Sequence, residues 1–412
     1  MKNEIKLTFV GDIMCQREQN AAAWARHNDY IYDETFAAVA GLFKDSDYVI
    51  GNLETPIAGS LYGYTSEPSQ FNTPETFLDA LKFTGIDFLS TANNHCLDRG
   101  VNGLEQTLRN LQSKGFDYAG TYASREASEQ IFIKEINGIR IAFLSFTYGT
   151  NSEYYGEPLA DNETWRVDLL KKQPKRFNGS LQNRSLRARL SSVLPPRAKQ
   201  AIAALLGRSN QRFSDFVPDN VSPSSINSLE HQHFVDRAKE KIGRAKDLAD
   251  FVILLPHIGG QYNPAPGEYQ KWTMHWMSQT GANAIIANHA HTSLRCEKFD
   301  NGCIGAYALG NFCFTPNTGW FIPNVLSEYG IILNLFVSTS EKKITRITYS
   351  VVKTVLEADG FASVHPVVKL ISNEGDITLR ERLIIENEAV VNRFGGMSQT
   401  INPQDHYIYN YL

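Results

Sequence analysis

The sequence has few cysteines, no long apolar run, no internal repeat and little net charge. Five cysteines, an odd number in 412 residues, argue against a disulfide framework, so we expect them to be reduced. No apolar stretch approaches the roughly 20 residues that span a bilayer, and no cleavable leader precedes the first apolar segment. These absences predict a cytoplasmic protein, with peripheral attachment to a membrane as the alternative.

What the sequence does contain is typical of an α/β protein with a sizeable core. Hydrophobic residues make up 42% of the chain, and apolar segments typical of strands alternate with helical ones through the first 150 residues. Asn137-Gly138 between two apolar runs predicts a β-hairpin. Helices are expected near residues 34–43, 74–83, 101–113, 225–246 and 268–280. An alternating strand pair is expected near residues 330–337 and 344–352, and a short strand and helix over 377–391.

Polar residues follow five of the apolar segments that have the pattern of strands. In open α/β sheets, ligands bind at the carboxyl ends of strands, so we expect these side chains to meet at one edge. They are Asp12 after residues 7–10, Glu54 after 48–50, Asn94 and His95 after 88–91, His257 after 251–255, and His289 and His291 after 282–286.

Such a mixture of histidine, carboxylate and amide side chains is what divalent transition metals favour in hydrolases. We expect two divalent ions, Mn, Fe or Zn, about 4 Å apart. Glu54 is the best candidate for a carboxylate that bridges them. The expected metal ligands are Asp12, Glu54, Asn94, His257, His289 and His291.

His95 is then left for catalysis, as a general acid or a stabiliser of the leaving group, and Asp98 could orient it. Taken singly, each motif has an ordinary explanation. Gly11-Asp12 could form a simple turn, and Asn94-His95 could cap a helix. Five polar strand ends in a chain with only ten histidines favour the metal site.

A basic segment interrupts the α/β pattern. Residues 166–212 contain twelve Lys or Arg and one acid, a net charge of +11, so the rest of the chain carries −15. The segment could gather a polyanionic substrate toward the metals, lie on an anionic membrane surface, or be a solvated insertion without a partner. We expect no nucleic acid, because Phe177 is the only aromatic residue in this range and stacking platforms are missing.

These motifs resemble those of the CapA-type capsule or poly-γ-glutamate synthesis family, a branch of the calcineurin-like metallophosphoesterases. They occur in the family's order between residues 5 and 315. The matching pieces are Phe9-Val10-Gly11-Asp12, Gly51-Asn52-Leu53-Glu54-Thr55-Pro56, Asn93-Asn94-His95-Cys96-Leu97-Asp98-Arg99-Gly100, His257-Ile258-Gly259-Gly260-Gln261-Tyr262, Asn288-His289-Ala290-His291 and Leu309-Gly310-Asn311-Phe312.

The resemblance implies a four-layer αββα sandwich with the metal centre where the strands end. It also implies a single metallophosphoesterase-like domain over residues 1–412. Within it we place a basic insertion at 150–225 and C-terminal strands and a helix at 330–412 that complete the second sheet. Two positions depart from the usual motifs. Met14 stands where metallophosphoesterases usually carry His, which leaves one metal position poorer in nitrogen ligands, and Gln261 replaces a common acid.

The leading hypothesis is a metal-dependent hydrolase of the phosphoesterase type that takes part in making or processing an anionic capsule or cell-surface polymer. Its partner would be that polymer or a phosphoester. One alternative keeps the metals but cleaves an amide of a γ-glutamyl polymer. Another, of a different class, is a non-catalytic capsule assembly factor.

Overall fold

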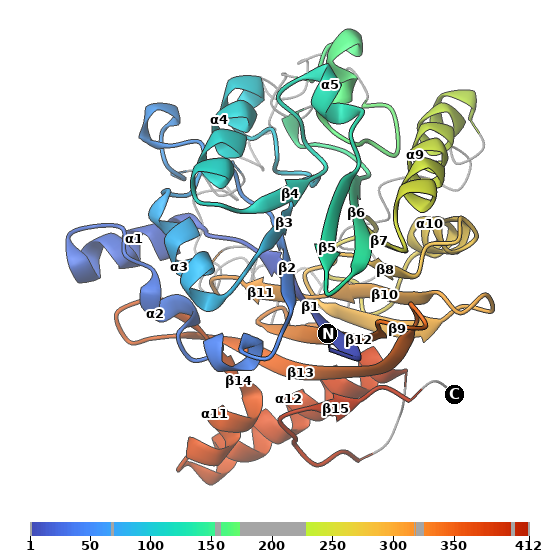
Figure 1. Ribbon diagram of the computed structural model, residues 1–412. Helices are drawn as coiled ribbons and strands as arrows, with labels where there is room; N and C mark the ends of the chain where they lie inside the picture. Colours follow the sequence, from blue (N-terminus) through green and yellow to red (C-terminus); the bar gives the residue numbers. More distant parts are fainter. Residues whose placement is uncertain are drawn as a thin grey trace, which may run out of the picture.

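The computed structural model describes residues 2–66, 70–152, 158–173, 228–316, 318, 325–396 and 400–410. Most of the basic segment, from residue 174 onward, therefore lies outside the described residues, and the expectations for it stay predictions. The described residues form a mixed α/β structure with two mixed sheets and several helices (Figure 1).

The first sheet has nine strands and combines both ends of the chain, in the order β14-β13-β12-β1-β2-β3-β4, with β11 beside β1 and β15 beside β13. Strands β1 to β4 run parallel, and β12 pairs antiparallel with β1. The bounds are β1 (Glu4–Ile13), β2 (Tyr48–Leu53), β3 (Phe88–Ser90), β4 (Asp117–Ala119), β11 (Asn311–Cys313), β12 (Tyr329–Ser338), β13 (Ile344–Leu356), β14 (Ala362–Pro366) and β15 (Tyr407–Ile408).

This order corrects the expected place of the C-terminal strands. They were assigned to the second sheet, but β12, β13 and β14 extend the first. The physical reason is burial, because β12 is buried along most of its length on both faces. Such a strand needs neighbours on both sides, and it finds them in β1 and β13.

The second sheet has six strands in the order β5-β6-β7-β8-β10-β9. Its bounds are β5 (Phe132–Ile136), β6 (Ile139–Thr147), β7 (Phe251–His257), β8 (Ala284–Ile286), β9 (Ser293–Lys298) and β10 (Ile304–Leu309). The hairpin predicted at Asn137-Gly138 is confirmed, because Ile136 pairs with Ile139. Both turn residues have positive φ, 50° and 85°, as a two-residue turn of this kind requires.

Helices cover the outer faces of the sheets. In Figure 1, α3 and α4 lie beside the β1–β4 half of the first sheet, and α9 and α10 lie beside the second sheet. Helices α4, α9 and α10 fall close to their predicted ranges, whereas the tail is one long helix without the expected strand. The bounds are α1 (Arg17–His27), α2 (Asp33–Phe36), α3 (Thr76–Thr84), α4 (Gly100–Ser113), α5 (Arg125–Ser128), α9 (Leu229–Leu248), α10 (Glu268–Ser278), α11 (Val367–Asn373) and α12 (Ile377–Gly395).

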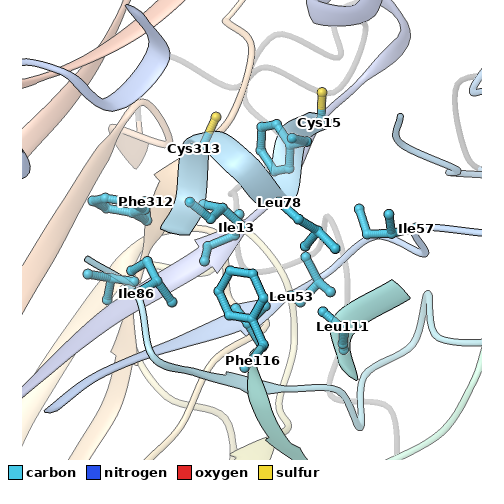
Figure 2. Packing of buried hydrophobic residues seen from close by; sticks show 14 of the residues in the cluster. Ile13, Cys15, Leu53, Ile57, Leu78, Ile86, Leu111, Phe116, Phe312 and Cys313 are labelled. Atoms are coloured by element: carbon cyan, nitrogen blue, oxygen red, sulfur yellow. The ribbon is translucent and has the colours of Figure 1, made fainter. Parts of the chain in front are cut away.

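Three large apolar clusters fill the spaces between these elements. One joins the first sheet to α3 and α4 and contains residues such as Ile13, Leu53 and Leu78 (Figure 2). A second contains residues of both sheets and of α12, and a third joins the second sheet to α9 and α10. All five cysteines are free thiols, as predicted. Among the described residues, no helix combines the length and apolar composition needed to cross a membrane.

The chain passes from one sheet to the other at Gly310. This residue follows β10 of the second sheet and precedes β11 of the first, and its φ of 74° lies in the left-handed region. The amide of Asp12 donates a hydrogen bond to the Gly310 carbonyl at 2.9 Å. A Cβ atom added to Gly11 would lie 1.9 Å from that carbonyl oxygen. The two sheets can therefore meet here only because residue 11 has no side chain.

Gly11→Ala should destabilise the protein strongly, because the obstructing atom is backbone and cannot move aside. Overpacking of this kind costs about 1–3 kcal/mol or more. The matched control is Gly41→Ala, since a Cβ at Gly41 meets nothing within 4 Å. Urea unfolding of both variants checks the expectation, and equal midpoints for the two would contradict it.

Candidate metal centre

Asp12 and Glu54 are brought together by two neighbouring parallel strands. Asp12 lies near the carboxyl end of β1, where it pairs with Asn52 of β2, and Glu54 follows β2 directly. Both carboxylates are fully buried. The side-chain amide of Asn52 donates to Asp12 Oδ1 at 2.7 Å. The other oxygen, Oδ2, lies 3.4 Å from His291 Nδ1.

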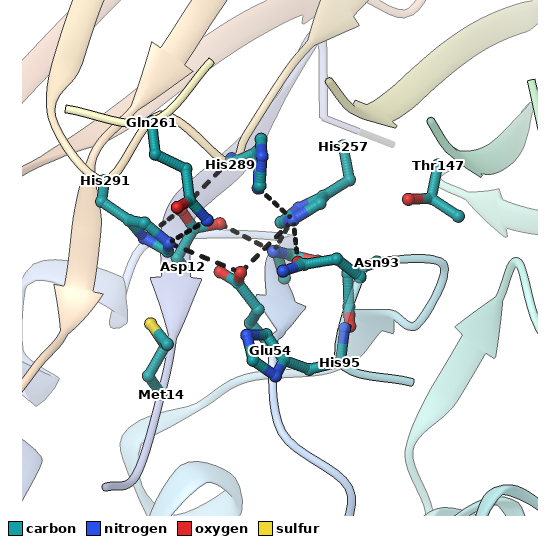
Figure 3. Close-up of polar contacts among 12 residues, drawn as sticks. Asp12, Met14, Glu54, Asn93, His95, Thr147, His257, Gln261, His289 and His291 are labelled. Atoms are coloured by element: carbon teal, nitrogen blue, oxygen red, sulfur yellow. Dashed lines mark hydrogen bonds and ion pairs between the residues drawn. The ribbon is translucent and has the colours of Figure 1, made fainter. Parts of the chain in front are cut away.

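Three histidines approach these carboxylates from the second sheet. His257 ends β7, while His289 and His291 lie in the loop after β8. The loop histidines have φ values of 102° and 53°, a region that residues with a Cβ adopt uncommonly. Figure 3 shows that the His291 ring contacts the Glu54 carboxylate, whereas the His289 ring contacts the nearby nitrogen of His257.

The first ligand group consists of Glu54, His257 and His289, whose ligand atoms all lie within 4.8 Å of one another. His257 Nε2 is 3.3 Å from Glu54 Oε1 and 2.9 Å from His289 Nδ1. Asn94 Oδ1 lies 2.7 Å from the same His257 nitrogen. Two nitrogens and two oxygens therefore converge on one point.

The second group consists of Asp12, Glu54 and His291. His291 Nε2 is 3.7 Å from Glu54 Oε1. Glu54 belongs to both groups, and among the described residues neither of its oxygens has a hydrogen-bond partner. A buried carboxylate without hydrogen bonds is costly unless positive charge balances it. These residues therefore fit a divalent cation, and the shared Glu54 allows a second one.

The electrostatics of the cluster favour a cation too. Burial raises the pKa of Glu54 well above its usual range, and the nearby Asp12 carboxylate raises it further. Burial lowers the pKa of His257 to about 3 and that of His289 well below its ordinary value, so both present neutral nitrogens. Burial also opposes the charge on His291, but Glu54 and Asp12 outweigh it and raise its pKa to about 9.

His95 and Asp98 form a separate pair at the edge of this cluster. His95 Nδ1 lies 2.7 Å from Asp98 Oδ2, which also accepts a hydrogen bond from the Phe71 amide at 2.7 Å. The His95 ring packs on Phe71 with centroids 4.3 Å apart. The remaining ring nitrogen, Nε2, lies 3.4 Å from Asn151 Nδ2. Nδ1 of His95 thus contacts the Asp98 carboxylate, and Nε2 lies on the opposite side of the ring.

All eight candidate residues predicted from the sequence lie in this region, but several contacting residues were missed. Asn52, Asn93 and Asn311 all make buried side-chain hydrogen bonds here. Each belongs to a motif quoted above, so its position was visible while its role was not. Met14, which stands where metallophosphoesterases usually carry a histidine, packs with Phe71 and Phe314 in a small apolar cluster.

The family of the chain is shown by comparison with protein-family models. The model described as "Bacterial capsule synthesis protein PGA_cap" matches residues 6–316. The chain belongs to this family. That range includes every residue of both ligand groups and the His95–Asp98 pair.

Two curated relatives have names that refer to PGA or capsule biosynthesis. "PGA biosynthesis protein CapA" of Bacillus subtilis (strain 168) is 27% identical over 77% of this chain and 64% of its own length. "Capsule biosynthesis protein CapA" of Bacillus anthracis is 26% identical over 77% of this chain and 61% of its own length. The match thus spans less than two thirds of either relative. Among solved structures, "GAP50 the anchor in the inner membrane complex of Plasmodium" aligns with 97% of this chain and 98% of its own, at 11% identity and a TM-score of 0.29.

The raised pKa of His291 predicts a pH dependence of stability in the cation-free protein. A group whose pKa is raised on folding stabilises the fold below its unfolded pKa and loses that contribution as pH rises through the folded value. The window here runs from 6.5 to about 9. The loss should be on the order of 3–4 kcal/mol at about 1.4 kcal/mol per unit. Thermal unfolding of chelator-treated protein across this range measures it.

His291→Gln should flatten this part of the profile, whereas the same change at His275, which is exposed on α10, should leave it intact. Parallel profiles for wild type and His291→Gln would contradict the assignment.

Proposed function

We propose that the protein is a metal-dependent hydrolase of the phosphoesterase type that acts in the synthesis or processing of an anionic capsule polymer. The observation that carries the proposal is the buried Glu54 carboxylate, shared by two ligand groups and without a hydrogen-bond partner among the described residues. Membership of the capsule synthesis family supports the biological setting.

We assign one cation to Glu54, His257, His289 and Asn94, and a second to Asp12, Glu54 and His291. When bound, Mn, Fe or Zn would lower the pKa of water toward neutrality and offset charge that develops on the reacting phosphoester. The protein's own contribution is to supply neutral nitrogens at His257 and His289 and to hold the Glu54 carboxylate in a dry site.

His95 is the proposed general acid. Asp98 fixes its Nδ1 at 2.7 Å, so the proton to be transferred is the one on Nε2. Phe71 supports one face of the ring and limits its rotation. His95 is close enough to influence the pKa of Glu54, and this supports a position for it beside the leaving group.

The finer architecture and the partners belong to the same proposal. We propose that the three apolar clusters are the interfaces between the layers of a four-layer αββα sandwich, since each joins a different pair of layers. We also propose an anionic polymer as the partner. The charge of residues 166–212 supports this, and contact of the same segment with an anionic membrane surface is the alternative.

His257→Ala should lose both bound cation and hydrolysis of a bis-aryl phosphodiester in the presence of Mn²⁺. The loss in turnover should be at least about 100-fold, since even residues that only orient ligands cost 10–100-fold. Metal content and initial rates are measured together, with the exposed His275→Ala as control. Bound cation without turnover in the wild type would favour the γ-glutamyl amide reaction, and no bound cation would favour the assembly factor.

His95→Gln should lower kcat by about 10²–10⁴-fold, the usual contribution of general acid catalysis, while cation content stays unchanged. The effect should shrink for a substrate with a 4-nitrophenol leaving group, which needs little protonation, and grow for an alkyl leaving group. Asp98→Asn should lower kcat less, because it leaves the His95 ring in place. Equal effects on both substrates would contradict the role of an acid.

A further inference from the structure

Asn311 is the first residue of β11 and contacts His291, but it belongs to neither ligand group. Its side-chain Oδ1 lies 3.0 Å from His291 Nδ1. The residue is buried, with 1% of its surface exposed. It is also the partner of Asp12 in the parallel register between β1 and β11. Asn311 therefore lies next to two members of the second ligand group.

The orientation of the Asn311 amide follows from its other contacts. Its Nδ2 donates to the carbonyl of Ser327 at 2.7 Å and to that of His291 at 3.2 Å. Backbone carbonyls only accept hydrogen bonds, so the nitrogen must be on that side. The oxygen of the amide is then the atom that faces the His291 ring.

This orientation settles the role of each nitrogen of His291. A side-chain carbonyl can only accept, so the proton of the contact sits on His291 Nδ1. The other nitrogen, Nε2, is the one that lies 3.7 Å from Glu54 Oε1. Asn311 Oδ1 accepts the hydrogen bond from Nδ1 at 3.0 Å, whereas Asp12 Oδ2 lies farther away at 3.4 Å and accepts a hydrogen bond from the backbone amide of His289 at 3.3 Å.

We propose that Asn311 is a positioning residue of the metal centre, which fixes His291 with Nδ1 as donor and Nε2 as ligand and so sets the cation affinity of the Asp12–Glu54–His291 position. This inference rests on the proposed function. Histidine ligands generally donate their second ring proton to such a partner, and loss of the partner costs 10–100-fold in metal affinity.

The other ligand group provides an internal reference. Asn311 has no hydrogen bond with His257, His289 or Asn94 among those of the described residues. A change at Asn311 should therefore weaken one of two cations. A general loss of structure would weaken both.

The experiment is a calorimetric titration of metal-depleted protein with Mn²⁺, combined with metal analysis after dialysis. Asn311→Leu removes the acceptor at nearly the same volume, and one of two binding events should weaken by 10–100-fold. Asn311→Asp keeps an acceptor oxygen for Nδ1 and should weaken that event clearly less. The control is Asn334→Leu, the same change at a buried asparagine that bonds Thr8 and Thr348. It should alter unfolding and leave both affinities unchanged.

Equal loss of both cations in Asn311→Leu would overturn the positioning role, and so would equal weakening by Leu and Asp. If Asn311→Leu does not fold, Asn311→Asp decides alone: loss of the second binding event in folded protein overturns the proposal, and its retention supports it. A wild type that binds no Mn²⁺ would instead refute the proposed function. If the wild type binds two ions and Asn311→Leu binds both with unchanged affinity, only this inference is refuted.

Discussion

The close approach of Gly11 and Gly310 joins the two sheets at the edge where the candidate metal centre lies. Asp12 directly follows the first of these glycines, and Asn311 directly follows the second. The hydrogen bond from the Asp12 amide to the Gly310 carbonyl therefore sets the distance between carboxylates of the first sheet and histidines of the second. Movement at this contact would separate Asp12 from His291, and the second ligand group would no longer exist.

The cluster is built at a cost in stability that a bound cation would offset. Glu54 is buried without a hydrogen-bond partner among the described residues, and two histidines beside it are held neutral. In the absence of a cation, the charged His291 is the main balance for the carboxylates. Replacing buried charged groups of this kind by apolar residues is often neutral or stabilising. The arrangement therefore fits a bound cation, whose charge would balance Glu54.

Much of this centre could be predicted because it follows from two local rules. Apolar segments mark strands, and parallel strands end at one edge, so Asp12, Glu54 and His257 were expected near one another, and the structure places them there. The sequence could not show that β12 pairs with β1, because partners such as Phe9 and Leu333 are brought together only by the whole fold. The sharing of Glu54 and the contact of Asn311 with His291 depend on side-chain orientations that spacing does not encode. The expectation of a strand in the tail was wrong because its apolar residues fit the periodicity of a strand as well as that of a helix. The residues form the single helix α12, which packs against the core between the sheets.

The pairing of β1 with β12 also has a consequence for synthesis. Residues 4–9 have their antiparallel partners at residues 333–338, so the amino-terminal strand leaves the ribosome long before its neighbour exists. Contacts this distant in sequence form slowly, and unpaired strand edges invite aggregation. Until β12 is made, β1 exposes one edge. That edge is covered only after residues 329–338 have been made.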